Sequence, residues 1–156
     1  MTIENNLLSP LNFSFKLKKA PNVEYLVQQI SVPGLNLGTA TSPTPFVRLT
    51  HPGNITYDDL RITFKVGENL TSYLEIYNWI EGLGRPDSYQ QYDYTPTDAT
   101  LVILNSAKRP IINIQFQDIF PTSLTSLEFD STMTDVQYMT VDATFAFDRM
   151  FYLPQE

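Results

Sequence analysis

The sequence predicts a mainly β fold with one α-helix, built as an antiparallel β-sandwich or curled half-barrel. Several segments alternate apolar and polar residues with a period of two, which is typical of strands buried on one face. A single segment has apolar residues at helical spacing instead. The chain has 156 residues, of which 42% are hydrophobic, so we expect one domain over 1–156.

The N-terminal part begins with a polar, irregular stretch, 1–11, which we expect to be an arm ordered by contacts. Phe13, Phe15 and Leu17 then alternate with polar residues and predict the first strand. A Lys-Ala-Pro-Asn turn leads into a second predicted strand, 25–32, which a Pro-Gly pair ends.

The segment 33–57 is rich in proline, glycine and small polar residues. It predicts a long loop with at most one short strand, at 46–49. Loops of this length in a compact domain are usually functional or ordered by a partner. We therefore expect this segment to contact another molecule.

A strand and a helix follow this loop. Alternation is clearest over 60–66, where leucine, isoleucine, phenylalanine and valine occupy one face. The period then changes to that of a helix over 70–83, with Asn69 as the expected N-cap and Ser72 with Glu75 as a capping box one turn later. Glycines at its end predict its termination.

The C-terminal half returns to β structure after a tyrosine-rich loop, 85–98. The sequence from Phe120 to Ser123 predicts a turn. The predicted strands are 99–104, 111–118, a short one at 127–129, and the longest alternating segment, 139–147. Adjacent antiparallel strands with one helix packed across them indicate a sandwich with open edges, which either sister copies or the chain's own loops could cover.

Charge and composition favour a protein with partners. The formal net charge is −7, which argues against binding to phosphate backbones. Only 17% of residues are charged and many are aromatic, so either other molecules cover part of the surface or this is simply an aromatic-rich β domain. Bases gather near Lys16 and acids after Asp118, which suits head-to-tail stacking or two solvated patches equally well.

The sequence offers no convincing catalytic, cofactor or metal residue. It contains no cysteine, and nothing in the sequence around its one histidine, His51, suggests a base held by a carboxylate beside a nucleophile. Asp58 and Asp59 are adjacent and would point to opposite faces of a strand. No apolar run approaches the ~18 residues of a membrane span, and no secretory signal is evident, so we expect no membrane partner.

Four segments resemble phage tail tube proteins in their order and spacing. Residues 48–64 look like that family's loop and strand, in which an aromatic residue and paired acids precede an alternating strand. An aromatic helix matches at 73–79. Residues 116–124 and 144–152 look like the family's aromatic-Pro-Thr turn and its final strand. The resemblance covers 12–152 and includes baseplate tube-initiator paralogues and, by fold, type VI secretion tube proteins.

The resemblance implies a half-barrel that completes a larger β-barrel in a ring. Hexameric rings would stack into a tube, contact sheath and baseplate or hub proteins, and let DNA pass without specific binding. The virion tail, assembled in the host cytoplasm, would be its location. The loop 33–57 would reach a neighbouring subunit or ring. Candidate contact residues are Pro43, Pro45, Phe46, Arg48, His51, Lys18 and Lys19, and candidate channel-facing acids are Glu128, Asp142 and Asp148.

We expect a structural subunit of a tail tube and no enzyme. The alternatives are a baseplate tube-initiator or tube-terminator protein, a type VI secretion-like tube protein, and a carbohydrate-binding β-sandwich. The last would use aromatic side chains for stacking on sugars, namely Trp79, Tyr89, Tyr92 and Tyr94, although the tyrosines suit a protein interface equally well.

Overall fold

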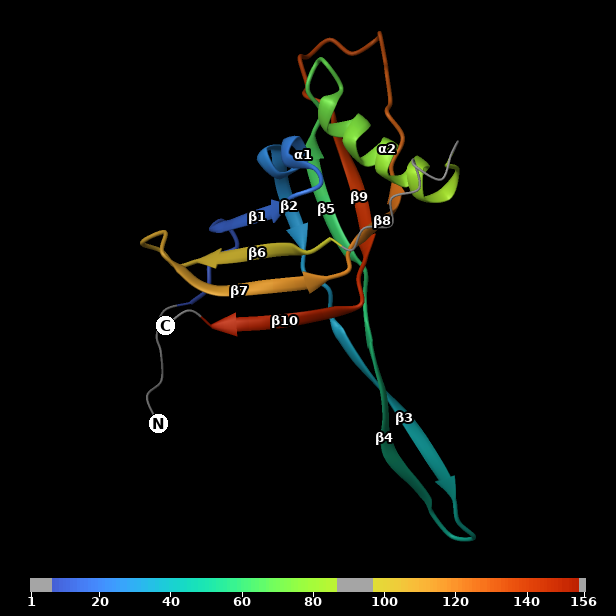
Figure 1. The fold of residues 1–156 in the computed structure, drawn as a ribbon. Coiled ribbons are helices and arrows are strands. Elements are labelled where there is room, and N and C mark those ends of the chain that lie inside the picture. Colours follow the sequence, from blue (N-terminus) through green and yellow to red (C-terminus); the bar gives the residue numbers. More distant parts are fainter. Residues whose placement is uncertain (1–6, 87–96, 155–156) are drawn as a thin grey trace.

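The computed structural model describes residues 7–86 and 97–154, which form two four-stranded antiparallel sheets, a hairpin and two helices (Figure 1). Sheet A contains, in spatial order, β1 (Phe13–Leu17), β6 (Ala99–Leu104), β7 (Pro110–Gln117) and β10 (Arg149–Pro154). Sheet B contains, in spatial order, β2 (Val27–Ser31), β5 (Leu60–Lys65), β9 (Thr140–Ala146) and β8 (Phe120–Leu124). The predicted mainly β, antiparallel fold is confirmed. Neither sheet closes on itself within the described residues.

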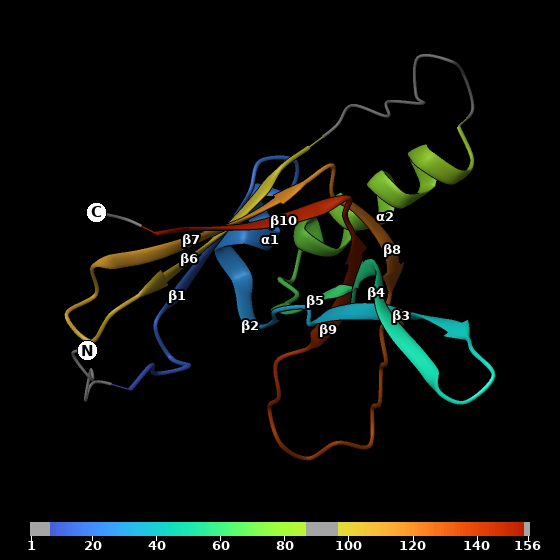
Figure 2. The ribbon, with the colours of Figure 1, turned by 90° about the horizontal axis from the view of Figure 1, so that it is seen from below.

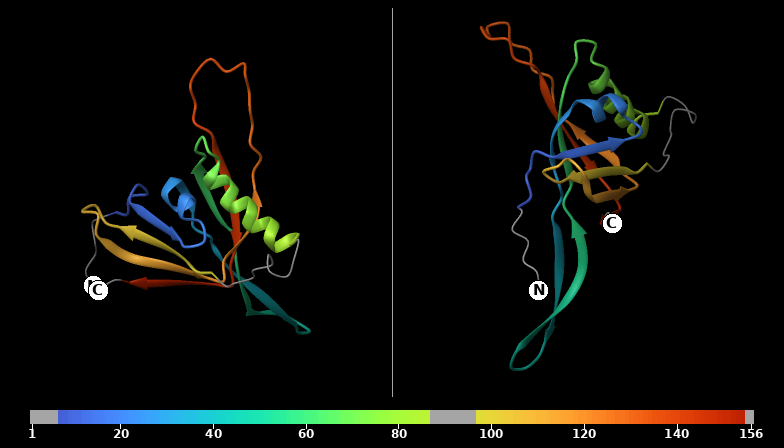
Figure 3. Two further views of the ribbon diagram at one scale, coloured as in Figure 1. Left: turned by 45° about the horizontal axis from the view of Figure 1, so that its top comes forward. Right: turned by 90° about the vertical axis from the view of Figure 1, so that its left-hand side faces the viewer.

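The core lies where the two sheets meet. Their strands run across one another (Figures 1 and 3), and each sheet turns one apolar face inward. Trp79 packs against Phe145 with ring centroids 6.1 Å apart, and Phe116 packs against Phe147 at 5.1 Å. The largest fully buried apolar side chains are Phe64, Phe116, Phe145, Leu17, Leu60, Ile62, Ile76, Ile114, Val23 and Val141.

Helix α2 (Thr71–Gly84) occupies the predicted position, but its capping differs from the prediction. Leu70 is the N-cap, in a left-handed conformation with φ 58°, and Asn69 Oδ1 accepts a hydrogen bond from Thr71 N at 3.3 Å. Ser72 is buried and donates to Lys65 O at 3.2 Å, so the expected capping box is wrong. The serine instead fastens the helix to β5.

A short helix, α1 (Pro21–Leu26), replaces the start of the strand predicted at 25–32. Proline at its first position has a backbone angle that suits a helix start. The Glu75 carboxylate supplies the acceptors that this N-terminus lacks, because it takes hydrogen bonds from Asn22 N at 3.2 Å and Asn22 Nδ2 at 2.7 Å. The prediction of a single helix is therefore wrong, because a contact 53 residues away stabilises the second.

The segment predicted as a loop at 33–57 is a long hairpin of β3 (Leu35–Pro43) and β4 (Arg48–Tyr57). It projects away from both sheets (Figures 1 and 2), and every residue of it except Tyr57 is exposed. Alternation failed to predict it, because neither face is buried in this chain. We call residues 35–57 the arm.

The C-terminal strand predicted at 139–147 ends early and its successor changes sheets. Strand β9 ends at Ala146, and β10 begins at Arg149 in sheet A. Two further predictions are wrong: 120–123 is strand β8 rather than a turn, and 127–129 lies in an irregular loop. The change of sheet lets one continuous segment contribute to both faces of the core.

Three carboxylates meet where the chain passes between the sheets. Asp118, with φ 54°, donates its backbone N–H to Asp98 Oδ1 at 3.3 Å, and Asp148 N donates to Gln117 O at 3.0 Å. Desolvation, a hydrogen bond with Asp148 and the charges of Asp148 and Asp98 together raise the pKa of Asp118 above its ordinary value. Ionised Asp118 therefore opposes folding at neutral pH.

We predict that Phe145→Ala lowers the free energy of unfolding by about 3–5 kcal/mol, because it removes a fully buried ring from the core. Phe129→Ala is the matched control. Its ring is 80% exposed, so the same substitution should change stability by no more than about 0.5 kcal/mol. Urea unfolding measures both. Equal losses would contradict the assigned core.

We predict that Asp118→Asn raises the Tm at pH 7, since it removes a carboxylate that is desolvated and repelled by Asp148 and Asp98, while keeping a residue that tolerates positive φ. The gain should shrink as the pH falls through the raised pKa of Asp118, because protonation of the native carboxyl removes the charge that asparagine lacks. Asp130→Asn is the control. Hydrogen bonds from Thr132 lower the pKa of Asp130, so this variant should show no gain at pH 7. A Tm for Asp118→Asn at or below that of the native protein would contradict the prediction.

Candidate assembly surfaces

The base of the arm carries an apolar face that the chain leaves uncovered. Leu35 pairs with Tyr57 and Leu37 with Ile55 across the two strands. Residues paired across antiparallel strands, and residues two apart along one strand, point to the same side, so these four side chains share a face. Leu35, Leu37 and Ile55 are each more than half exposed. Exposed apolar surface of this kind is typical of surfaces that contact other proteins.

The tip of the arm presents a single aromatic residue in a fixed turn. The Thr44 hydroxyl donates to Val47 O and accepts from Val47 N, which holds the turn between Pro43 and Arg48. Phe46 lies within this turn and is 96% exposed. An aromatic side chain on a preordered turn loses little conformational entropy on binding, which is the property of an interface anchor.

A second protrusion extends from the opposite end of sheet B (Figure 1). It is the irregular loop 125–139 between β8 and β9, which we call the acidic loop. It carries Glu128, Asp130 and Asp135 and no basic residue, whereas the arm has Arg48, His51 and no carboxylate. Its large apolar side chains are exposed as well: Phe129, Met133, Val136 and Tyr138.

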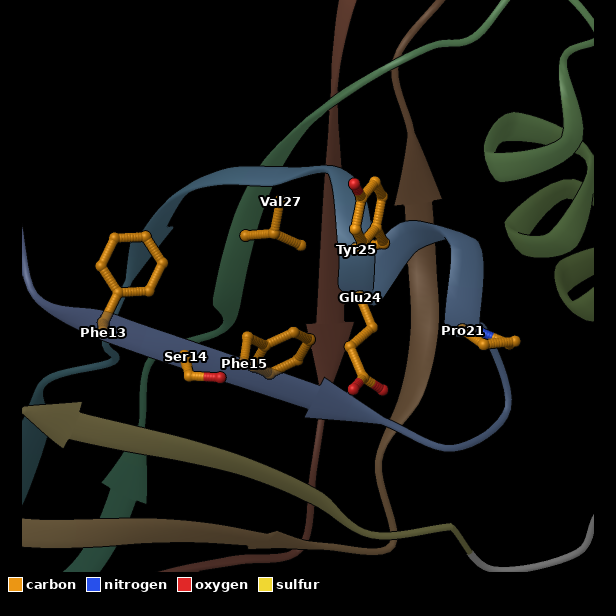
Figure 4. Close-up of a pocket in the computed structure, with 7 residues that line it drawn as sticks. All are labelled: Phe13, Ser14, Phe15, Pro21, Glu24, Tyr25 and Val27. Atoms are coloured by element: carbon orange, nitrogen blue, oxygen red, sulfur yellow. The ribbon is translucent and has the colours of Figure 1, made fainter. Parts of the chain in front are cut away.

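The free edge of β1 forms the wall of a groove of about 470 Å³ between β1, α1 and β2 (Figure 4). The Glu24 carboxylate accepts a hydrogen bond from Leu17 N at 2.9 Å and so covers one end of this edge. Phe13 and Phe15 line the remainder, and the ring of Tyr25, which is 88% exposed, stands beside them. The groove is open to a neighbouring molecule.

The candidate contact residues separate into two places. Five of them are gathered at the tip of the arm or along β4: Pro43, Pro45, Phe46, Arg48 and His51. Lys18 and Lys19 lie between β1 and α1 in the body, where the Lys19 ammonium lies 5.2 Å from the centroid of the Trp79 ring.

The three candidate acids are not brought together. Asp142 lies on β9 and its Oδ1 accepts a hydrogen bond from the Thr63 hydroxyl at 2.5 Å. Glu128 belongs to the acidic loop and Asp148 to the turn between β9 and β10. Their proposed channel-facing role therefore depends on how copies assemble.

Sequence reasoning missed the apolar side chains at the base of the arm and in the acidic loop. The sequence predicts a loop for the arm and a short strand at 127–129 in the acidic loop, and neither prediction indicates that the apolar side chains stay exposed. An excess of exposed apolar residues over what a monomer needs was the available indication.

His51 is exposed on β4 opposite Ala40, away from the sheets. No group of His, Asp or Glu within 7–86 and 97–154 could hold a metal ion, and no helix there has the length and apolar character to cross a membrane. The predicted sugar-stacking or interface tyrosines, Tyr89, Tyr92 and Tyr94, lie outside the described residues.

Comparison with known proteins gives one family match and several relatives in fold. The family model of the T4-like virus tail tube protein gp19 matches residues 11–147. The tail tube terminator protein of Enterobacteria phage T4 is 30% identical over 115 residues, which are 67% of this chain and 64% of that protein's length. The chain thus spans less than two thirds of this curated relative.

Solved structures with the same fold come from contractile injection systems. The cap that terminates the tube of the anti-feeding prophage superimposes with a TM-score of 0.72 at 19% identity, over 99% of this chain and 96% of that one. The sheath/tube terminator of the PVC extracellular contractile injection system gives 0.71 at 18% identity, over 97% and 99%. Because the family match spans most of the sequence, this chain belongs to the T4-like virus tail tube protein gp19 family.

Proposed function

We propose that this protein forms the ring that terminates the tail tube of a contractile-tailed phage. The observation that carries this proposal is the 30% identity to the tail tube terminator of phage T4, to which the two terminator structures of similar fold add support. A main tube subunit, a baseplate tube initiator and a type VI secretion-like tube protein are the alternatives within the same fold.

The open sheets support a ring. Each sheet has four strands, so its two edge strands run in opposite directions. Copies arranged head to tail around an axis would then place the last strand of one antiparallel to the first strand of the next, which continues the sheet. Six copies would give a barrel of about 24 strands, more than the 16–18 that already leave an aqueous channel in porins.

The charge balance supports a channel that does not bind its cargo. A lysine- or arginine-rich wall would gain counterion-release energy at each phosphate contact and so retain DNA. With a net charge of −7, the chain has few cations to line a channel. We infer that DNA passes without specific binding, and that the ring contacts sheath proteins within the virion tail.

The test is the size and shape of the purified protein. We predict discrete rings in negative-stain images and a mass of six chains by light scattering, without long tubes at high concentration. Long tubes would instead assign a main tube subunit. A monomer at high concentration that binds in a glycan array would favour the carbohydrate-binding sandwich and overturn the proposal.

A separate prediction concerns Phe46 at the tip of the arm. Phe46→Ala should leave the Tm unchanged, because this ring is 96% exposed, and should weaken docking onto purified tail tubes about tenfold or more, as loss of an interface anchor does. Thr41→Ala, an exposed polar position on the same arm, is the control and should dock like the native protein. Native docking by Phe46→Ala would remove the arm from the interface.

A further inference from the structure

We propose that Tyr25 on α1 of one copy packs into the groove between α2 and β8 of the next copy in the ring. This inference rests on the proposed ring. It names a side-chain contact that adjoining copies make in addition to the pairing of their edge strands, and so identifies residues that fix the alignment of the copies.

The receiving groove, which we call the α2–β8 groove, has a volume of about 470 Å³. Helix α2 lines one side of it with Tyr73, Tyr77 and Ile80, and β8 lines the other side with residues 122–124. The two tyrosine rings stack with their centroids 6.4 Å apart and an angle of 18° between their planes. Tyr77 is 47% exposed, so the chain itself covers this aromatic surface only in part. Such a surface suits a further aromatic ring.

Tyr25 is an aromatic residue that its own chain leaves uncovered. Its side chain is 88% exposed at the junction of α1 and β2 (Figure 4). Helix α1 is held in a fixed position, because Glu24 accepts a hydrogen bond from Leu17 N and Glu75 accepts one from Asn22 N. A tyrosine on a fixed helix loses little conformational entropy when it binds, and tyrosine is enriched at protein interfaces.

The α2–β8 groove and Tyr25 lie at opposite edges of sheet B. Strand β8 is the last of the sheet, and β2, which directly follows α1, is the first. All neighbouring strands in this sheet are antiparallel, so β2 and β8 run in opposite directions. When one copy continues the sheet of the next, the start of β2 at Val27 therefore meets the end of β8 at Leu124. Leu124 lines the groove, and Tyr25 lies two residues before Val27.

The two helices also lie on the same face of sheet B. Val23 of α1 and Ile76 of α2 are both buried in the core, and a hydrogen bond of 2.7 Å from Asn22 Nδ2 to the Glu75 carboxylate joins the helices. Rotation about a ring axis places the same face of every copy on the same side of the wall. Helix α1 of one copy therefore lies on the side where its neighbour opens the α2–β8 groove.

The polar groups of the groove suit the hydroxyl of a tyrosine. Glu81 and Arg85 belong to its lining, and Ser123 is exposed on β8. A tyrosine ring can pack on aromatic side chains while its hydroxyl donates a hydrogen bond to a carboxylate or accepts one from a guanidinium. The lining thus provides for both ends of the side chain.

Strand pairing alone defines the alignment of two copies poorly. Each edge strand has five residues, and Pro121 in β8 has no N–H to donate to a neighbour. Register is weakly specified where strands are short and their exposed residues are polar, as Gln28, Gln29 and Thr122 are. A side chain seated in a groove beside the strands removes this freedom.

The chain contains no cysteine, so single introduced thiols can test the contact. Rings are assembled from equal amounts of Tyr25→Cys and Tyr77→Cys protein and treated with a short bismaleimide. We expect a cross-linked dimer on a denaturing gel, because the two thiols come from adjoining copies. Tyr152→Cys in place of Tyr77→Cys is the matched control. Tyr152 is similarly exposed, at 54%, but lies on β10 in sheet A, so this mixture should give no dimer.

Rings that give no dimer with Tyr25→Cys and Tyr77→Cys, or an equal yield with the control, would overturn the contact and leave the proposed ring intact. A native protein that forms no ring would overturn both. Should Tyr77→Cys not enter rings, Glu81→Cys repeats the experiment, since Glu81 is an exposed residue of the same groove.

A second measurement concerns the strength of the contact. Tyr25→Ala should raise the protein concentration needed for ring assembly about tenfold or more, as loss of an interface anchor does, whereas Tyr152→Ala should assemble like the native protein. The dissociated Tyr25→Ala chain should keep the native Tm, because the ring is exposed. Native assembly by Tyr25→Ala would contradict the proposed contact.

Discussion

A sheet that ends in an unpaired strand presents a row of backbone N–H and C=O groups that need partners, and this constraint governs the molecule. Both four-stranded sheets end this way within the described residues. The chain covers only part of these edges, as Glu24 does at Leu17. The arm adds a hairpin whose apolar side chains have no core to enter. A fold that is well packed inside and incomplete at its margins is suited to assembly, and a contractile tail tube is such an assembly.

The sequence predicts those strands and that helix whose apolar side chains pack against other residues of the same chain. Leu60, Ile62 and Phe64 alternate because one face of β5 is buried, and α2 keeps helical spacing because Ile76 enters the same core. The sequence predicts a loop where the arm lies, since strands exposed on both faces show no alternation. Helix α1 is stabilised by hydrogen bonds to the distant Glu75 carboxylate. The turn between β9 and β10, before Arg149, takes the chain from sheet B to sheet A. No local pattern encodes either event.

The candidate surface residues also differ in how well the sequence predicts their grouping. Pro43, Pro45 and Phe46 are candidates because they belong to a long proline-rich segment that resembles a loop reaching a neighbouring subunit, and they lie together at the tip of the arm. The candidate acids lie apart, because their grouping would be a property of the ring rather than of one chain. Charge is nevertheless segregated along the molecule, from an arm without carboxylates to an acidic loop without bases. That polarity would give the two ends of the proposed ring different partners.

Amide hydrogen exchange, compared between dissociated and assembled protein, tests the central claim most directly. If sister copies complete the sheets, the amides of β2 and β8 gain protection on assembly, while those of the inner strands β5 and β9, already bonded on both sides, change little. Edge strands equally protected in the dissociated chain, or unchanged on assembly, would contradict the account.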